Sequence, residues 1–197
     1  MDRRDALRLF GATAALPATD LLALGQRMHE RLAARPTLRT FDPHQNATVT
    51  AVADRILPAT DTPGAVAARV NEFADLLLTE WAPEEQRAHF LAGLADLDTR
   101  ARAAFGKDFV EGGEADQVRL LTLLEDEAFR LKDQPGRHPE SFFHMIKWVT
   151  MFGYYTSEVG ARQELHFEII PGRYLPCTPL GAADGVPGGA GGEGGGR

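Results

Sequence analysis

Residues 141–155 read SFFHMIKWVTMFGYY and form the most aromatic stretch of this 197-residue chain. Apolar side chains recur in it at three- and four-residue spacing, which is the repeat of one face of an α-helix. The stripe consists of Phe142, Ile146, Val149 and Phe152. Most of the stability of such a helix comes from other elements that cover its apolar face. The stretch therefore predicts a core helix, and with it a helical fold.

Three aromatic residues of the same stretch lie off this stripe, namely Trp148, Tyr154 and Tyr155. Aromatic side chains at the rim of a fold are frequent anchors of protein–protein contacts. They also occur in a second buried layer of a core. The sequence leaves both interpretations open.

Helical spacing also occurs in four earlier segments, at about 43–57, 66–81, 83–105 and 114–131. Asp42 marks the first start, because it can cap a helix that has Pro43 in its first position and Gln45 in its third. The stripe of the second segment runs from Val66 to Trp81, so both are expected on its buried face. These segments supply the helices that would surround residues 141–155.

The two ends of the chain have different patterns. Residues 20–35 have helical spacing and precede Pro36, which predicts a stalk helix before the main domain. Residues 165–179 combine alternation with prolines, which favours an extended arm. Residues 181–197 are rich in glycine and poor in apolar side chains, so we expect them to be disordered.

The predicted fold is mainly α. It is a compact bundle of about five helices, with an N-terminal signal and stalk helix and an extended C-terminal arm. The predicted divisions are a signal and stalk at 1–36, a helical domain at 37–180, and a disordered tail at 181–197.

The first residues, MDRRDALRLFGATAALPA, resemble a twin-arginine export signal. Arg3 and Arg4 precede Leu7 and a short, weakly apolar stretch, which is the order of a charged region followed by a hydrophobic one. The alternative is an amphipathic first helix with solvated arginines. Residues 16–18, Leu-Pro-Ala, are a weak match to a processing site, so cleavage after Ala18 and retention of the signal both stay open.

Composition limits the possible partners. The formal charge of −7 and the scattered Lys and Arg residues do not provide a cationic surface for phosphate backbones, so nucleic acid is not expected as a partner. Cys177 is the single cysteine, so it cannot close a disulfide within the chain. After the N-terminus no apolar run reaches the length of about 18 residues that is typical of a membrane span.

Motifs for chemistry are weak. One cluster has metal-ligating residue types, but its spacing does not match H-E-x-x-H. The cluster consists of His138, Glu140, His144, His166 and Glu168. Two carboxylate pairs, Asp96 with Asp98 and Glu125 with Asp126, lie in helical segments and are expected on solvated faces. No catalytic, cofactor-binding or metal-binding residue is therefore assigned.

Two stretches that helical periodicity does not require carry a family resemblance. They are ILPATDTPG at 56–64 and GYYTSE at 153–158. With their surroundings they resemble the gluconate 2-dehydrogenase subunit 3 family, over roughly residues 1–180. Agreement at two such distant places is difficult to obtain by chance.

The resemblance implies an accessory subunit without a catalytic site or cofactor of its own. Members of that family accompany a large flavoprotein of the glucose-methanol-choline oxidoreductase type, which holds FAD, oxidises a sugar or sugar acid, and often passes electrons to a cytochrome c. The small subunit carries the twin-arginine signal, here Arg3, Arg4 and Leu7, and escorts the flavoprotein through the translocon. The expected location is the periplasm, with attachment to the outer face of the inner membrane left open.

An escort of this kind needs a stable interface with aromatic anchors. The candidate interface residues are Trp148, Tyr154, Tyr155, Tyr174 and Cys177. Two alternatives remain. One is a small metal-binding periplasmic enzyme that uses the histidine and glutamate cluster at 138–168, and the other is a membrane tether for the dehydrogenase complex.

Overall fold

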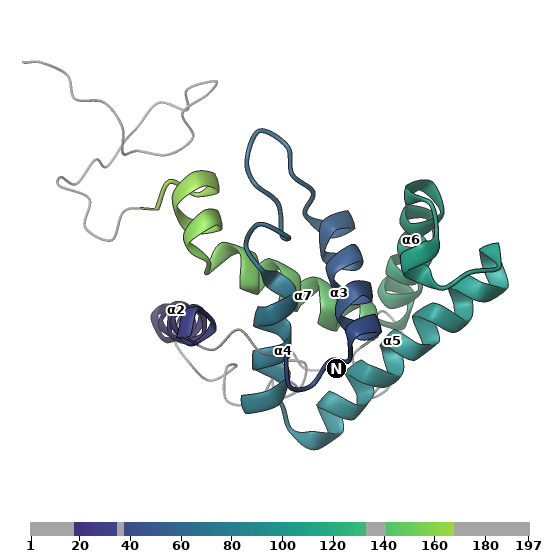
Figure 1. The fold of residues 1–197 in the computed structure, drawn as a ribbon, viewed down its shortest axis with the longest axis horizontal. Helices are drawn as coiled ribbons and strands as arrows, with labels where there is room; N and C mark the ends of the chain where they lie inside the picture. Colours follow the sequence, from purple (N-terminus) through teal and green to yellow (C-terminus); the bar gives the residue numbers. More distant parts are fainter. Residues whose placement is uncertain (1–17, 35–37, 133–140, 168–197) are drawn as a thin grey trace, which may run out of the picture.

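The structure is a computed structural model that describes residues 18–34, 38–132 and 141–167 (Figure 1). These ranges contain the helices α2 (Ala18–Ala34), α3 (Pro43–Ile56), α4 (Val70–Glu80), α5 (Glu84–Phe105), α6 (Glu114–Lys132) and α7 (Phe142–Tyr155). Two short helical turns, η2 (Phe109–Glu111) and η3 (Gly160–Glu164), complete them, and the same ranges contain no strand. The prediction of a mainly helical bundle is confirmed.

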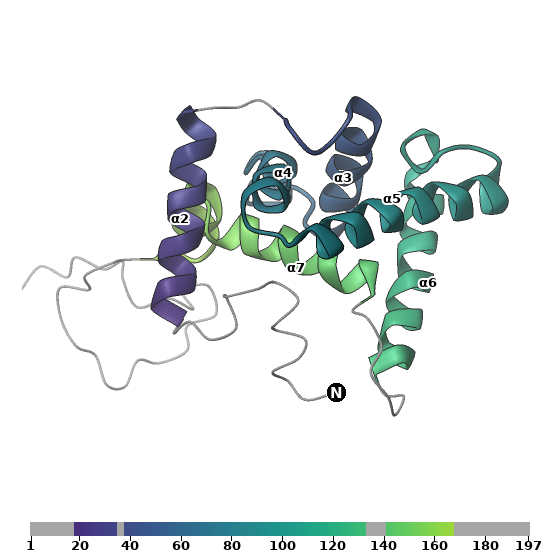
Figure 2. The same ribbon diagram turned by 90° about the horizontal axis from the view of Figure 1, so that it is seen from below.

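Helix α7 lies at the centre of the fold. It packs against α3, α4, α5 and α6, and it runs between α2 and α6, which stand at opposite ends of the molecule (Figure 2). Its most deeply buried side chains include Met145, Ile146 and Val149. Phe142 and Phe152 of the predicted stripe are only partly buried. Several helices cover α7, so its buried face is wider than one stripe.

The helix start predicted at Asp42 is present, and a glycine ends α5. The Asp42 carboxylate accepts a hydrogen bond from the backbone N–H of Gln45 at 2.8 Å, and the N–H of Asp42 donates to the Gln45 side chain at 3.0 Å. Pro43 occupies the first turn of α3. Gly106 ends α5 in the left-handed region, with φ of 77°. These local signals act without help from the rest of the fold.

Helix α2 belongs to the core, which differs from the stalk expected for residues 20–35. Leu24, Met28 and Leu32 are buried in the main apolar cluster, and α2 packs against α4. Helix α2 also lies close to Thr156, because a Cβ added at Gly25 of α2 would lie 2.5 Å from the Thr156 side chain. The sequence predicts the helix at 20–35 from its spacing, but it does not show which surface covers the apolar side of that helix.

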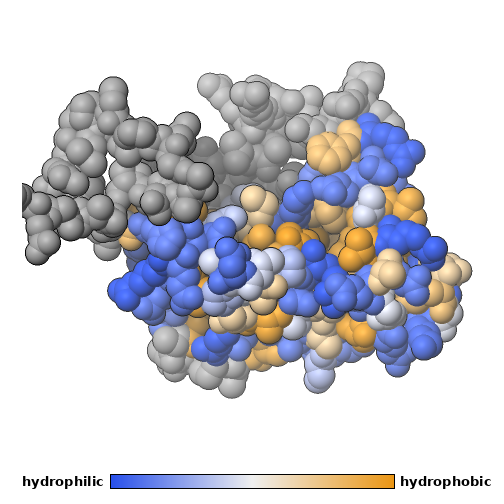
Figure 3. Space-filling model, turned by 90° about the horizontal axis from the view of Figure 1, so that it is seen from above, coloured by the Kyte–Doolittle hydropathy of each residue, from blue (hydrophilic) through white to orange (hydrophobic). Residues whose placement is uncertain are grey.

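Some large apolar side chains remain exposed among the described residues. They are Val66, Trp81, Val118, Leu123, Phe129, Leu131, Met151, Leu165 and Phe167. Val66 and Trp81 were expected on a buried face, and this is wrong because α4 begins only at Val70 and ends at Glu80. Figure 3 views the molecule from the top of Figure 1, and orange hydrophobic residues on that face lie between blue hydrophilic ones. None of the described helices is long and apolar enough to cross a lipid bilayer.

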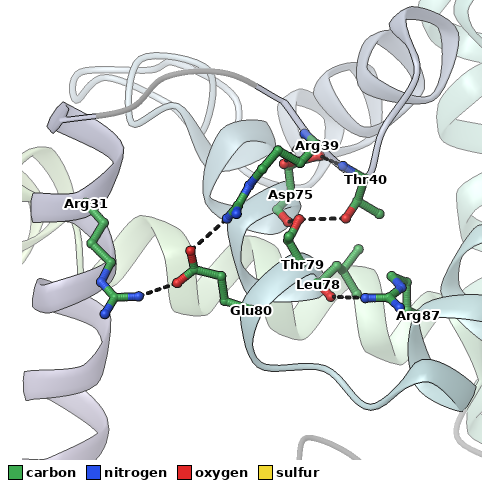
Figure 4. Close-up of polar contacts among 8 residues, drawn as sticks. All are labelled: Arg31, Arg39, Thr40, Asp75, Leu78, Thr79, Glu80 and Arg87. Atoms are coloured by element: carbon green, nitrogen blue, oxygen red, sulfur yellow. Dashed lines mark hydrogen bonds and ion pairs between the residues drawn. The ribbon is translucent and has the colours of Figure 1, made fainter.

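A buried carboxylate fixes the segment before α3 (Figure 4). Asp75 on α4 is buried and accepts hydrogen bonds from three successive backbone N–H groups, those of Arg39 at 2.9 Å, Thr40 at 2.8 Å and Phe41 at 2.8 Å. Glu80, further along α4, pairs with Arg31 of α2 and, at 2.7 Å, with Arg39. Helix α4 therefore holds both α2 and the start of α3.

A second buried carboxylate joins α3, α5 and η2. Asp98 is only 6% exposed, and it accepts from the backbone N–H of Phe109 at 2.9 Å and contacts His44 Nε2 at 2.7 Å. The expectation that Asp98 lies on a solvated face is therefore wrong. The Gln117 side chain donates to the Phe109 carbonyl at 2.9 Å. We refer to His44, Asp98, Phe109 and Gln117 as the α3–α5 corner.

Candidate functional site

The two non-periodic stretches noted in the sequence lie side by side in space. The loop at 57–69 joins α3 to α4 at the top of Figure 1, next to the light green segment that follows α7. The hydroxyl of Tyr154 donates to the carbonyl of Pro63 at 2.7 Å. The hydroxyl of Thr62 donates to the Glu164 carboxylate at 2.5 Å. We refer to residues 57–69 and 156–167 together as the loop end.

Backbone hydrogen bonds fold the loop tightly. The N–H of Ala65 donates to the Leu57 carbonyl at 2.9 Å, and the N–H of Thr60 donates to the Thr62 carbonyl at 3.0 Å. A Cβ added at Gly64 would lie 2.6 Å from the Leu57 carbonyl oxygen. Glycine is therefore required at position 64 by the close approach of another part of the backbone.

Tyr154 supports this loop from inside. It is 3% exposed and packs in a small apolar cluster with Ala53, Ala65, Ala68 and Val70. Its prediction as an interface residue is therefore wrong for the described fold. Tyr154 has the buried role that the sequence had left open, and its hydroxyl satisfies a loop carbonyl.

The other predicted interface residues have different positions. Trp148 is partly buried and stacks on Phe152, with ring centroids 4.8 Å apart. Tyr155 is partly buried and packs edge-on against Tyr154 at 5.2 Å. Tyr174 and Cys177 lie outside the described residues, as do the predicted signal residues Arg3, Arg4 and Leu7. Within the described ranges, Trp148, Tyr154 and Tyr155 therefore do not form one exposed surface, because Tyr154 is buried.

The predicted metal-ligand cluster is only partly within the described residues. His138, Glu140 and Glu168 lie outside them, whereas His144 packs edge-on against Phe129 and His166 is exposed. Within the described ranges no three His, Cys, Asp or Glu residues are grouped in a way that could hold a metal ion.

The outer surface of the loop end combines apolar and acidic side chains. Val66, Leu165 and Phe167 are 47%, 44% and 45% exposed. Asp61 is exposed, and its pKa lies below its ordinary value, chiefly because the Thr60 hydroxyl donates a hydrogen bond to it. A carboxylate with a lowered pKa is charged at neutral pH.

The guanidinium groups at the loop end are already engaged. Arg162 pairs with Glu158 at 2.9 Å, and Arg69 pairs with Glu72 at the start of α4. Asp61 and Glu164 instead accept hydrogen bonds from the hydroxyls of Thr60 and Thr62. Among the described residues, neither of these two carboxylates forms an ion pair.

Backbone conformation also distinguishes the loop end. Arg69 and His166 have φ of 54° and 47°, and among the described residues they are the non-glycine residues with positive φ. A side chain in the left-handed region costs free energy, so such residues persist only where the surroundings determine them strongly. Both lie in the loop end.

A histidine connects α2 to α7 beside the loop end. His29 lies 2.9 Å through Nε2 from the Gly153 carbonyl and stacks on Phe73, with ring centroids 4.8 Å apart. Because a carbonyl can only accept, Nε2 carries the proton. Burial lowers the pKa of His29, and the bond to Gly153 opposes that shift.

The pKa of His44, at the α3–α5 corner, is shifted in the opposite direction from that of His29. Its pKa is raised, first of all because it donates to the Asp98 carboxylate. His44 is well exposed, so water screens this interaction. The two histidines were not assigned roles from the sequence, because each role depends on a residue distant in the chain.

Comparison with known protein families identifies a match. The chain matches the family described as gluconate 2-dehydrogenase subunit 3 over residues 43–172. The matched range begins with α3 and includes both segments of the loop end, whereas α2 lies before it. No curated protein and no solved structure matches the chain.

Proposed function

Because the chain belongs to the gluconate 2-dehydrogenase subunit 3 family, we propose that it is the accessory subunit and export escort of a flavoprotein dehydrogenase. The family is that of a subunit in a multi-subunit gluconate dehydrogenase, so an accessory role with dehydrogenase partners follows from membership. The match over 43–172 is the observation that carries the proposal. The escort role, the type of flavoprotein and the route of export are the finer parts that need a test.

In this proposal the chemistry belongs to the partner. The partner is a glucose-methanol-choline type flavoprotein that holds FAD, oxidises a sugar or sugar acid, and passes electrons to a cytochrome c subunit. The buried acids of this chain support the structural role, because Asp75 and Asp98 bind backbone N–H groups that the fold would otherwise leave unpaired.

Export is assigned to the first residues. Arg3, Arg4 and Leu7 form the twin-arginine address, and the folded pair reaches the periplasm together. A folded cargo requires that the two subunits bind before transport, so their interface must be stable by itself. Tyr174 and Cys177 are proposed to extend that interface beyond the described residues.

The test is export of the flavoprotein with signal variants. This chain is co-expressed with a glucose-methanol-choline type flavoprotein dehydrogenase from the same genome, either as wild type or as the double variant Arg3→Lys, Arg4→Lys. We expect the double variant to reduce periplasmic flavin and dehydrogenase activity at least about tenfold, with the flavoprotein retained in the cytoplasm. Arg8→Lys is the matched control, because it changes an arginine outside the pair.

Two results would contradict the proposal. If the flavoprotein reaches the periplasm in equal amount with the double variant, this chain is not its escort. If the purified wild-type chain carries no flavoprotein at all, the accessory role itself is wrong for this protein.

A further inference from the structure

We propose that the loop end, residues 57–69 with 156–167, is the surface that docks the flavoprotein, through a site on the partner that combines apolar side chains with an arginine or lysine. This inference rests on the proposed function and identifies where on this chain the partner binds. Three properties of the loop end support it, namely its exposed apolar side chains, its preorganisation and its unpaired carboxylates.

The exposed apolar side chains lie on two segments that are held together. Val66 belongs to the loop, and Leu165 and Phe167 follow η3, with each of the three between 44% and 47% exposed. The hydrogen bond from Thr62 to Glu164 joins these segments. Burial of half-exposed apolar side chains in a complex is a principal source of binding free energy.

The loop end is already ordered in the free chain. Tyr154 holds the Pro63 carbonyl, Ala65 bonds to Leu57, and the N–H of Phe167 donates to the Ala161 carbonyl at 2.8 Å. A surface in its bound conformation loses little conformational entropy on association. The free energy of burial is then available for affinity.

Charge indicates what the partner presents. Asp61 and Glu164 bear negative charge beside the apolar residues, and the arginines of the loop end are paired with other carboxylates. A cation from the partner would meet Asp61 without breaking an existing ion pair. Complementary charge of this kind gives specificity and faster association.

Helix α6 is the competing surface, and it fits less well. Val118 and Phe129 are on one face of the helix but lie eleven residues apart, roughly 16 Å, with Glu125 between them. Leu123 lies on another face. The ring of Phe129 already packs edge-on against His144. These side chains do not make a continuous patch.

The test measures co-purification of the flavoprotein with the full chain. The double variant Val66→Glu, Phe167→Glu places charge in the proposed apolar contact. We expect it to reduce the flavin recovered per subunit at least about tenfold, with an unchanged melting temperature of the free subunit. Phe129→Glu is the matched control, because it changes an equally exposed phenylalanine on α6, and it should leave recovery within about twofold of wild type.

A charge reversal tests the predicted cation. Asp61→Lys should lower the recovered flavoprotein about fivefold or more, and the effect should diminish as salt is raised, because it arises between charges near the surface. Asp126→Lys on α6 makes the same change of charge on an exposed residue away from the loop end and should have little effect.

The outcomes separate this inference from the proposed function. Recovery of flavoprotein with wild type and equally with the Val66→Glu, Phe167→Glu variant would overturn the loop end as the docking surface. The same is true if Phe129→Glu abolishes recovery instead. Absence of flavoprotein from the wild-type preparation would overturn the proposed function, and with it the surface that rests on that function.

Discussion

The loop end and the α3–α5 corner solve the same problem with different groups. Each must provide hydrogen-bond partners for backbone groups that helical hydrogen bonds leave unpaired. The corner uses a buried charge, because Asp98 receives the N–H of Phe109 and the side chain of His44. The loop end uses neutral hydroxyls, because Tyr154 donates to Pro63 and Ser157 donates to the Tyr154 carbonyl at 2.6 Å. Removing the buried carboxylate should therefore lower the free energy of unfolding strongly, whereas removing any one hydroxyl should lower it only a little.

Loss of the buried charge is the largest expected effect. Asp98→Ala leaves the N–H of Phe109 without its acceptor inside the fold, and we expect the free energy of unfolding to fall by about 3 kcal/mol. Urea denaturation measures it. Asp96→Ala is the control, because Asp96 lies on the same helix and is exposed, and it should change stability by less than about 0.5 kcal/mol. Equal effects of the two variants would contradict a structural role for Asp98.

A substitution that disturbs the backbone of the loop end should reduce stability more than the loss of one of its hydroxyl groups. Gly64→Ala forces a Cβ against the backbone of residues 57–59, at 2.6 Å, so the loop must shift. We expect a loss of about 2 kcal/mol in urea denaturation. Gly113→Ala is the matched control, because nothing lies within 4 Å of a Cβ added there. If Gly64→Ala is as stable as Gly113→Ala, the loop is not as tightly packed as described.

A single hydroxyl should matter less. Tyr154→Phe keeps the ring in its apolar cluster and removes the bond to Pro63, so we expect a loss of about 1 kcal/mol. Hydrogen exchange should report faster opening of residues 57–69 while the α3–α5 corner is unchanged. Tyr155→Phe provides the comparison on the next residue. An effect as large as that of Asp98→Ala would remove the distinction between the two regions.

The smallest expected effects are those of pH, and they have opposite signs. His44 has a raised pKa in the folded state, so its contribution is complete below about 6.5 and is lost as pH rises through the folded value. His29 has a lowered pKa, so its contribution is complete above about 6.5 and is lost as pH falls toward the folded value. Melting temperatures of wild type, His44→Gln and His29→Gln across this range measure both. The fall in melting temperature toward acid pH is assigned to His29, so it should persist in His44→Gln. Its loss in that variant would contradict the assignment.

Helix caps and helical periodicity could be predicted from the sequence, whereas the burial of polar side chains in the folded chain could not. The Asp42 cap, the Gly106 stop and the helical periodicities act within a few residues, so the sequence displays them directly. The burial of Asp98 and Tyr154 depends on Phe109 and Pro63, which come from other elements. A period-based interpretation places such residues on a surface because it contains no information on what covers them.

The same limit applies to the candidate site. The stretches at 56–64 and 153–158 were recognised as unusual because helical periodicity does not require them, and the structure brings them into contact through Tyr154. Leu165 and Phe167 were assigned to an extended arm, so their place beside the loop was not expected. The sequence carries no signal for this placement, because the hydrogen bond from Thr62 to Glu164 that joins the two segments forms only in the folded chain.

The packing of α2 restricts how the protein can be matured. Leu24, Met28 and Leu32 fill the main core, and Arg31 joins α2 to Glu80. A peptidase that cut beyond residue 34 would release these side chains and leave Phe73 without the ring of His29. We therefore expect any cleavage of the proposed export leader to fall before Leu24, so that the buried side chains of α2 remain in the mature subunit.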